Sequence, residues 1–379
     1  MRSNYKPLGK YIQPVDERNT DLLDLPLMGL SVSKVFFPTI ANLVGTDMRT
    51  YKIVYRNQFT YIADTSRRGD KIAIALNDRF DKMLVSQAYT PFEVKDTNEL
   101  DPEYLMMWFR RPEFDRYARF KSHGSAREIF DWEEMCNTLL PIPHITKQRE
   151  IVKEYNTIQN RIILNQQLIQ KLEETAQAIY RERFVEGIDV ENLPKGWRVG
   201  SVSELCNYST KRISIAELDL NNYISTENML QDRGGVVTAN NLPSATNVSN
   251  FEIGNILISN IRPYFKKIWL ANFHGGCSND VLCLVPKANI PSLYLYQILE
   301  KDAFFEYVMA GSKGTKMPRG DKKWIMTYPA IIPDKQLLDK FNNLVAVIQR
   351  DIHIKYQENQ KLTELKELLL SKLATVNQY

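Results

Sequence analysis

The sequence predicts an α+β protein built from two pseudo-repeated globular units and two long helices that pair antiparallel. Three observations support this: one segment occurs twice, a long heptad-patterned segment follows each copy, and short β-branched runs precede each copy. A length of 379 residues is enough for two or three domains. Apolar residues at 44% and charged residues at 25% are ordinary globular values, which excludes a disordered or low-complexity chain.

The internal repeat aligns Tyr104–Pro143 with Tyr294–Pro333 without a gap, at a constant offset of 190 residues. Nine aligned pairs are identical, where unrelated segments of this length share about two or three. A duplication therefore organises the chain. The identical pairs are Tyr104/Tyr294, Leu105/Leu295, Phe114/Phe304, Tyr117/Tyr307, Ser122/Ser312, Gly124/Gly314, Asp131/Asp321, Ile142/Ile332 and Pro143/Pro333.

Each unit begins with β-rich runs and continues into a helix. Runs of Val, Ile and aromatic residues predict strands at 53–55, 72–76, 255–259 and 281–285. One helix is expected over 102–120 and its counterpart over 291–310, each followed by a polar loop that contains glycine.

Two long helices are predicted after the repeated segments. No Gly or Pro interrupts residues 148–186, which predicts one helix of about 40 residues. Apolar residues in steps of three and four predict coiled-coil seams, with a looser heptad in the second helix. The seams comprise Ile151, Tyr155, Ile158, Ile162, Asn165, Ile169 and Leu172, then Phe341, Val345, Ile348, Ile352, Asn359, Leu362 and Leu369. The expected domains are 1–145, 146–187, 188–333 and 334–379.

Motifs that carry catalysis are missing. The sequence contains no phosphate-binding G-x-x-x-x-G-K-[ST] loop, no G-x-S-x-G elbow and no H-E-x-x-H pair. His274, Cys277 and Cys283 have irregular spacing, so core cysteines are favoured over a metal site. Asp334, Glu364 and Lys366 mimic a nuclease motif, but they would lie far apart along a long helix. We therefore expect no catalytic residues and no metal.

The cellular setting is read from what the chain contains. Four cysteines without a C-x-x-C pair fit a reducing compartment. The first residues lack the apolar core of a secretory signal, and no run of 18 apolar residues suggests a membrane span. The expectation is a soluble cytoplasmic protein.

Basic clusters are the positive functional signal. The formal charge of +4 is too small for a polycation, so affinity for nucleic acid must come from local clusters. Such clusters recur at matching places in both halves, on loops that also contain Gly, Ser or Pro. A single cluster would be read as a solvated loop, but the recurrence favours two DNA-reading modules. The candidate DNA-binding residues are Arg67, Arg68, Lys71, Lys121, Ser125 and Arg127 in the first half, and Arg262, Lys266, Lys267, Lys313, Lys316, Arg319, Lys322 and Lys323 in the second.

These features resemble the DNA-specificity subunit of a type I restriction–modification enzyme, over essentially the whole chain. The resemblance rests on the repeat, on Lys147-Gln148 and Lys335-Gln336 where the long helices begin, and on the Leu193–Trp197 segment that leads into the second unit. It implies two target recognition domains that read an asymmetric bipartite double-stranded DNA target, with the helices as spacer.

The resemblance also implies partners. Two methyltransferase subunits would dock on the helices, and restriction/translocase subunits would complete a prokaryotic complex that methylates adenine. This chain would hold no cofactor, because the partners bind S-adenosylmethionine, ATP and Mg²⁺. Two alternatives stay open: a coiled-coil scaffold that does not bind DNA, and a two-site DNA-binding regulator, although no helix-turn-helix pattern is found.

Overall fold

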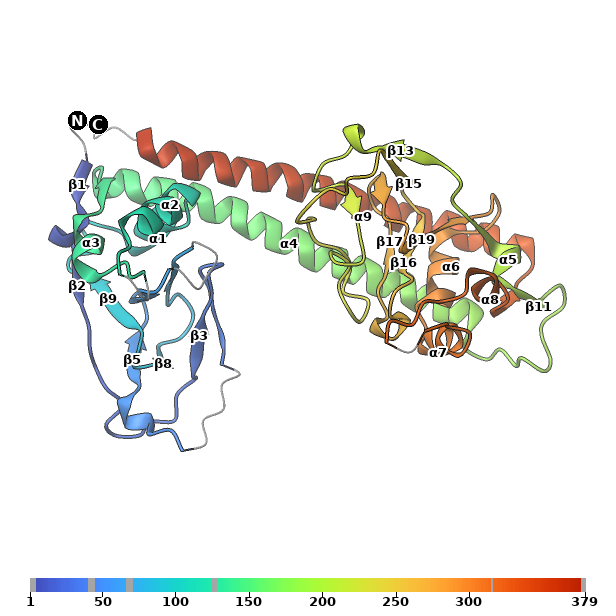
Figure 1. The fold of residues 1–379 in the computed structure, drawn as a ribbon, viewed down its shortest axis with the longest axis horizontal. Coiled ribbons are helices and arrows are strands. Elements are labelled where there is room, and N and C mark those ends of the chain that lie inside the picture. Colours follow the sequence, from blue (N-terminus) through green and yellow to red (C-terminus); the bar gives the residue numbers. More distant parts are fainter. Residues whose placement is uncertain (1–4, 40–44, 66–70, 125–127, 315, 376–379) are drawn as a thin grey trace. The chain divides into compact units, whose positions relative to one another are not determined.

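The chain forms two compact units (Figure 1), in a computed structural model that describes residues 5–39, 45–65, 71–124, 128–314 and 316–375. Unit 1 comprises Met1–Leu164 and Glu358–Tyr379, and unit 2 comprises Asn165–Gln357. Each long helix therefore contributes one end to each unit.

Unit 1 is built around a four-stranded sheet with the strand order β2-β9-β6-β7. The antiparallel pairs β3–β4 and β5–β8 lie outside this sheet, and β1 pairs antiparallel with β10. The strands are β1 (Tyr5–Pro7), β2 (Ile12–Pro14), β3 (Met28–Leu30), β4 (Phe36–Pro38), β5 (Lys52–Tyr55), β6 (Phe59–Ile62), β7 (Ala73–Leu76), β8 (Lys82–Val85), β9 (Thr90–Val94) and β10 (Leu139–Pro141). The strands predicted at 53–55 and 72–76 are confirmed as β5 and β7.

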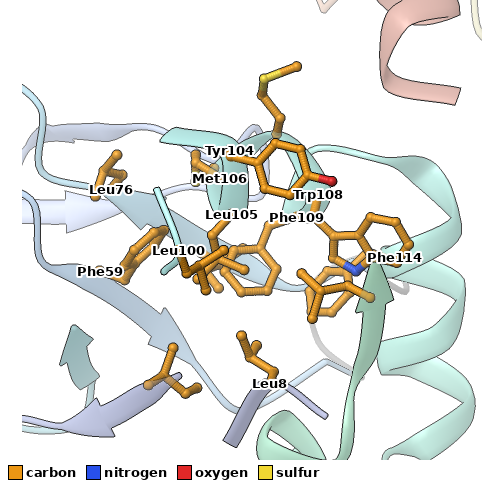
Figure 2. Packing of buried hydrophobic residues seen from close by; sticks show 14 of the residues in the cluster. Leu8, Phe59, Leu76, Leu100, Tyr104, Leu105, Met106, Trp108, Phe109 and Phe114 are labelled. Atoms are coloured by element: carbon orange, nitrogen blue, oxygen red, sulfur yellow. The ribbon is translucent and has the colours of Figure 1, made fainter. Parts of the chain in front are cut away.

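The single helix predicted over 102–120 is wrong, because the structure has α1 (Pro102–Phe109) and α2 (Pro112–Lys121). Pro112 lacks an N–H and disfavours helical backbone at the preceding residue, so Arg111 is extended (φ −70°, ψ 135°). A third helix, α3 (Trp132–Asn137), follows. The aromatic and aliphatic side chains of α1 fill the core against the sheet (Figure 2).

Unit 2 repeats this plan. Its main sheet has the order β12-β19-β16-β17, and β11 pairs antiparallel with β20. A second sheet has the order β13-β15-β18-β14. The strands are β11 (Arg198–Ser201), β12 (Cys206–Tyr208), β13 (Arg212–Ser214), β14 (Tyr223–Ile224), β15 (Asn247–Phe251), β16 (Ile256–Ser259), β17 (Ile268–Leu270), β18 (Gly275–Cys277), β19 (Val281–Pro286) and β20 (Pro329–Ile332). Strands β16 and β19 confirm the predictions at 255–259 and 281–285.

The helix predicted over 291–310 is also interrupted, although no proline lies at the break. The helices of unit 2 are α5 (Val202–Leu205), α6 (Ser292–Leu299), α7 (Asp302–Ala310) and α8 (Lys322–Met326). Lys301 is extended (φ −65°, ψ 146°). Arg233 Nε donates to the carbonyl of Glu300 at 2.6 Å, so a side chain from elsewhere in the chain satisfies this helix end.

Equivalent residues make equivalent bonds in the two units, which confirms the duplication. Tyr104 Oη donates to the carbonyl of Pro141 at 3.0 Å, and Tyr294 Oη donates to that of Ile331 at 2.5 Å. The donors and the acceptors both differ by 190 in number. The four strands of the main sheets also pair in the same order.

The long helices are α4 (Ile145–Phe184) and α9 (Lys335–Lys372). Within unit 1, Arg161 bonds Glu358 at 2.7 Å and Lys366 bonds Gln159 at 3.0 Å, so these helix ends run antiparallel. Within unit 2, the rings of Tyr180 and Phe341 lie 6.4 Å apart. The predicted pair of long antiparallel helices is confirmed.

Half of the predicted seam residues are buried, and the other half are half-buried. Asn165 is only 2% exposed. The buried seam residues are Ile151, Tyr155, Ile162, Asn165, Ile169, Phe341 and Val345, and the half-buried ones are Ile158, Leu172, Ile348, Ile352, Asn359, Leu362 and Leu369. Near the end of α9, Leu370 and Leu373 join the unit 1 core instead of Leu369.

The start of α4 is locked onto unit 1 by the fully buried amide of Gln148. Its Nε2 donates to the carbonyls of Glu99 and Pro143 at 2.8 Å each, and its Oε1 accepts from the N–H of Asp101 at 2.9 Å. Gln336, which follows Lys335 as Gln148 follows Lys147, is exposed near the start of α9. The two Lys-Gln pairs thus differ in structure.

Candidate nucleic-acid interface

Two basic loops of unit 2 are joined backbone to backbone. The first follows β16 and the second follows α7. Together, residues 260–267 and 311–321 are termed the unit 2 loop pair, of which residue 315 lies outside the described residues. The N–H of Arg262 donates to the carbonyl of Pro318 at 2.9 Å, and Ile261 forms a β-bridge with Arg319. The two clusters that the sequence singled out separately in this half therefore lie side by side.

Unit 1 contains the same construction. Its loop pair is defined as residues 63–71 and 121–131, of which 66–70 and 125–127 lie outside the described residues. The N–H of Thr65 donates to the carbonyl of Glu128 at 3.1 Å, and Asp64 forms a β-bridge with Ile129. Glu128 and Ile129 stand 190 residues before Pro318 and Arg319, so both units join these loops at equivalent positions.

An aspartate anchors the second loop of each pair. Asp131 Oδ1 accepts from the N–H of Glu134 at the start of α3, and His123 lies 3.5 Å from its other oxygen. Asp321 Oδ1 accepts from the N–H of Lys323 at the start of α8, and Lys313 lies 3.0 Å from its other oxygen. The Lys313 ammonium, together with two backbone N–H groups, lowers the pKa of Asp321.

A glycine in the left-handed region turns each of these loops. Gly124 has φ 130° and Gly314 has φ 93°, values that residues with a Cβ rarely adopt. The pairs His123/Ile129 and Lys313/Arg319 then close the loops as β-bridges. The repeated Gly and Asp thus shape a loop, while the side chains around them differ between the units.

The predicted cations of unit 2 fall into two groups. Lys313, Lys316, Arg319, Lys322 and Lys323 are exposed, and Arg319 donates to Asp280 at 2.6 Å. Among the ion pairs in the described part of the chain, none involves Lys316, Lys322 or Lys323.

The other three are half-buried and have structural partners. Lys266 pairs with Asp302 at 2.9 Å, and Arg262 lies over the ring of Phe265 at 5.9 Å. Lys267 Nζ donates to the carbonyl of Thr226 at 2.7 Å, and burial lowers its pKa. Lys266 and Lys267 thus tie the first loop of the pair to α7 and to Thr226, and Arg262 packs within that loop.

In unit 1, the structure places only part of the predicted set. Lys71 is exposed, and Lys121 is half-exposed at 3.4 Å from Glu134. Arg67, Arg68, Ser125 and Arg127 lie outside the described residues, so their role in DNA binding stays a prediction.

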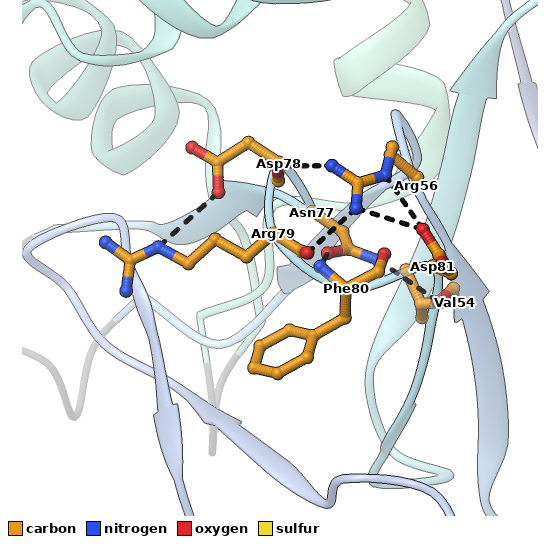
Figure 3. Close-up of polar contacts among 7 residues, drawn as sticks. All are labelled: Val54, Arg56, Asn77, Asp78, Arg79, Phe80 and Asp81. Atoms are coloured by element: carbon orange, nitrogen blue, oxygen red, sulfur yellow. Dashed lines mark hydrogen bonds and ion pairs between the residues drawn. The ribbon is translucent and has the colours of Figure 1, made fainter.

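The turn between β7 and β8 of unit 1 presents a cation that the sequence analysis missed (Figure 3). The guanidinium of Arg56 binds this turn: it donates hydrogen bonds to the Asp81 carboxylate and to the carbonyls of Asp78 and Arg79. The side chain of Arg79 is 81% exposed, and its contact with Asp78 is long, at 3.8 Å. The basic residues alone gave no signal here, because acidic neighbours cancel their charge.

Metal-binding groups, reactive thiols and membrane-spanning helices were sought in the part of the chain that the structure describes. There, no group of three or more His, Cys, Asp or Glu side chains could hold a metal ion. Burial raises the pKa of Cys206 and Cys283 to about 12. No described helix is both long and apolar enough to cross a membrane.

Comparisons with known proteins agree with the geometry. Residues 43–174 match the family model of the type I restriction modification DNA specificity domain. No curated protein sequence matches the chain. The structure resembles the S subunit of a type I restriction–modification system from M. genitalium, with a TM-score of 0.56, 14% identity, and coverage of 98% of this chain and 95% of that one.

Two further solved structures are similar at lower scores. One is the HsdS subunit from Thermoanaerobacter tengcongensis, with a TM-score of 0.37, 18% identity, and coverage of 99% of this chain and 97% of that one. The other belongs to a study of complex assembly and conformational transition of the type I R-M system, with a TM-score of 0.45, 17% identity, and coverage of 97% and 96%. Residues 43–174 therefore match a type I restriction modification DNA specificity domain, and the chain as a whole shares its fold with an S subunit of such a system.

Proposed function

We propose that the chain reads an asymmetric, two-part double-stranded DNA target and thereby directs adenine methylation and restriction by partner subunits. Unit 1 reads one half-site and unit 2 reads the other. The observation that carries this proposal is the loop pair, which occurs once in each unit with equivalent backbone bonds and different side chains.

The differences between the loop pairs favour two unlike half-sites. Where unit 1 has His123 and Ile129, unit 2 has Lys313 and Arg319. A dimeric repressor with identical readers recognises a palindrome, whereas two fused readers with different side chains recognise two different sequences. Exposed lysines such as Lys316 and Lys323 suit phosphate contacts, and base edges are read by the more variable polar side chains.

Partner subunits would dock on the long helices. Apolar side chains remain exposed along them in both units, and such surfaces commonly mark protein interfaces. They are Ile163, Leu164, Leu365 and Leu368 in unit 1, and Leu168, Leu344, Val347 and Ile354 in unit 2. We assign these surfaces to two methyltransferase subunits, with restriction/translocase subunits completing the complex. The partners would bind S-adenosylmethionine, ATP and Mg²⁺, and this chain would bind no cofactor.

A gel-shift experiment on a random-sequence DNA pool, with and without the methyltransferase subunits, tests this proposal. The lone chain should bind weakly, because a formal charge of +4 supports only a short phosphate footprint. The complex should enrich one two-part sequence with a fixed gap. Enrichment of nothing by the complex would favour a protein-binding scaffold, and tight specific binding by the lone chain would favour a two-site regulator.

A further inference from the structure

The loop between β16 and β17 in unit 2 carries unusual backbone strain. Arg262 (φ 56°) and Lys266 (φ 50°) flank a short 3-10 helix, Pro263–Phe265, and both adopt left-handed backbone. The adjoining residues Asp232 (φ 51°) and Arg233 (φ 63°) do the same. These four are most of the seven non-glycine residues with positive φ in the described part of the chain. Such strain persists only where the surroundings enforce it, and it clusters at functional sites.

The surroundings hold this loop from two sides. The N–H groups of Asp232 and Arg233 donate to the carbonyls of Phe265 and Lys266 at 2.9 and 3.0 Å. The side chains of Arg233 and Lys266 both pair with the Asp302 carboxylate, at 2.5 and 2.9 Å. On the other side, the loop is bonded to the carbonyl of Pro318 through Arg262. The loop is thus fixed before any ligand arrives, which lowers the entropy cost of binding.

An aromatic side chain stands exposed at the tip of this fixed loop. Tyr264 is 46% exposed, and its ring meets Phe265 edge to face with centroids 4.7 Å apart. Met317, on the loop bonded to it, is 54% exposed. Exposed Lys316 lies next to Met317 in the chain, and exposed Lys313 lies on the same loop. A tyrosine on a solvent loop is ordinary by itself. An exposed ring on a rigid loop that also carries Arg262, Lys266 and Lys267 matches the aromatic platforms on which nucleic-acid bases stack.

We propose that Tyr264 is a base-contacting residue, whose ring packs against a base at one step of the half-site read by unit 2. This inference rests on the proposed function, and it adds a specificity determinant that carries no charge. The lysines around it would contact phosphates, which position the protein without reading sequence. The affinity would then depend on how readily one base step unstacks, as it does where apolar side chains wedge between bases in other DNA complexes.

Binding by the complex with methyltransferase subunits tests this inference, on DNA carrying the two-part target and every single-base variant of it. Tyr264→Ala should weaken binding to the target roughly 5- to 150-fold, the range for the loss of one base–aromatic stack. The preference should flatten at one step of the unit 2 half-site and stay unchanged throughout the unit 1 half-site. Tyr264→Phe keeps the ring and should retain both. The salt dependence of binding should not change, because no phosphate contact is lost.

With the alanine variant, two results would overturn the inference: unchanged affinity, or an equal loss on all sequences with a shallower salt dependence. A second measurement, of 2-aminopurine fluorescence, uses the wild-type complex. With 2-aminopurine placed in turn at each position of the target, fluorescence should change on binding at a step of the unit 2 half-site. A probe series without any change also contradicts the inference. If the wild-type complex prefers no sequence, the proposed function has failed instead, so the two failures are distinguishable.

Discussion

Replacing Gln148 with alanine should destabilise unit 1, whereas the same change at Gln336 should not. Gln148 is fully buried, and its amide makes three hydrogen bonds of 2.8–2.9 Å that fix the start of α4 to Glu99, Asp101 and Pro143. Each bond contributes about 1 kcal/mol, and buried groups left without partners cost more, so the free energy of unfolding should fall by about 3–5 kcal/mol. For a unit of this size, the melting temperature should fall by roughly 6–20 °C.

The assay is thermal denaturation of the full chain followed by circular dichroism, with two matched variants. Gln336→Ala removes an exposed amide from the other Lys-Gln pair and should change the free energy by less than about 0.5 kcal/mol. Gln148→Glu keeps the shape and the acceptor for Asp101 but places a carboxyl group against the carbonyls of Glu99 and Pro143, so it should destabilise at least as much as Gln148→Ala. Equal effects at the two glutamines would refute the reasoning that only Gln148 locks a helix to its unit.

Three further predictions address DNA binding, spacing and pH. Lys316→Ala combined with Lys323→Ala should weaken binding of the complex to all DNA sequences alike. The slope of log affinity against log salt should become shallower by about 2, and an unchanged slope in a salt titration would contradict a phosphate role. Seven residues inserted into both long helices, after Leu164 and after Gln357, preserve the heptad and add about 10 Å of rise. Methylation mapping should then show a gap about three base pairs longer, with both half-sites unchanged. An unchanged gap would mean that the helices do not set its length. Burial raises the pKa of Glu300 to about 7, against opposing effects of Arg233 and Lys301. The folded state therefore binds a proton more tightly than the unfolded state, and this group's contribution to stability is lost as pH rises from about 4.5 to 7. Glu300→Gln should raise the melting temperature at pH 8 more than at pH 5, and equal shifts at both pH values would contradict this assignment.

The duplication could be predicted because the residues that repeat serve the internal structure of each unit. Tyr104 and Tyr294 make the same buried bond, Asp131 and Asp321 anchor the same loop, and Gly124 and Gly314 turn it. The heptads likewise predicted both long helices, since a long period-3.5 pattern reports one local conformation. Both features leave a pattern in the sequence itself, as a repeated segment and as a heptad.

Features that depend on distant residues could not be predicted. The ion pair of Arg319, a predicted DNA-binding residue, could not be foreseen, because its partner Asp280 lies 39 residues away in the sequence. The break before α7 depends on Arg233, whose side chain satisfies the carbonyl of Glu300. The two Lys-Gln pairs are identical in sequence, yet only Gln148 lies where three backbone groups converge. Each case is decided by tertiary contacts that carry no local pattern.

Mapping of adenine methylation across the host genome, before and after deletion of the gene for this chain, tests whether this chain selects the methylated sites. Methylation should disappear at one asymmetric two-part motif with a fixed gap, and it should return when the chain is supplied again. Methylation that is unchanged by the deletion, while the methyltransferase subunits are still produced, would contradict the claim that this chain selects the sites.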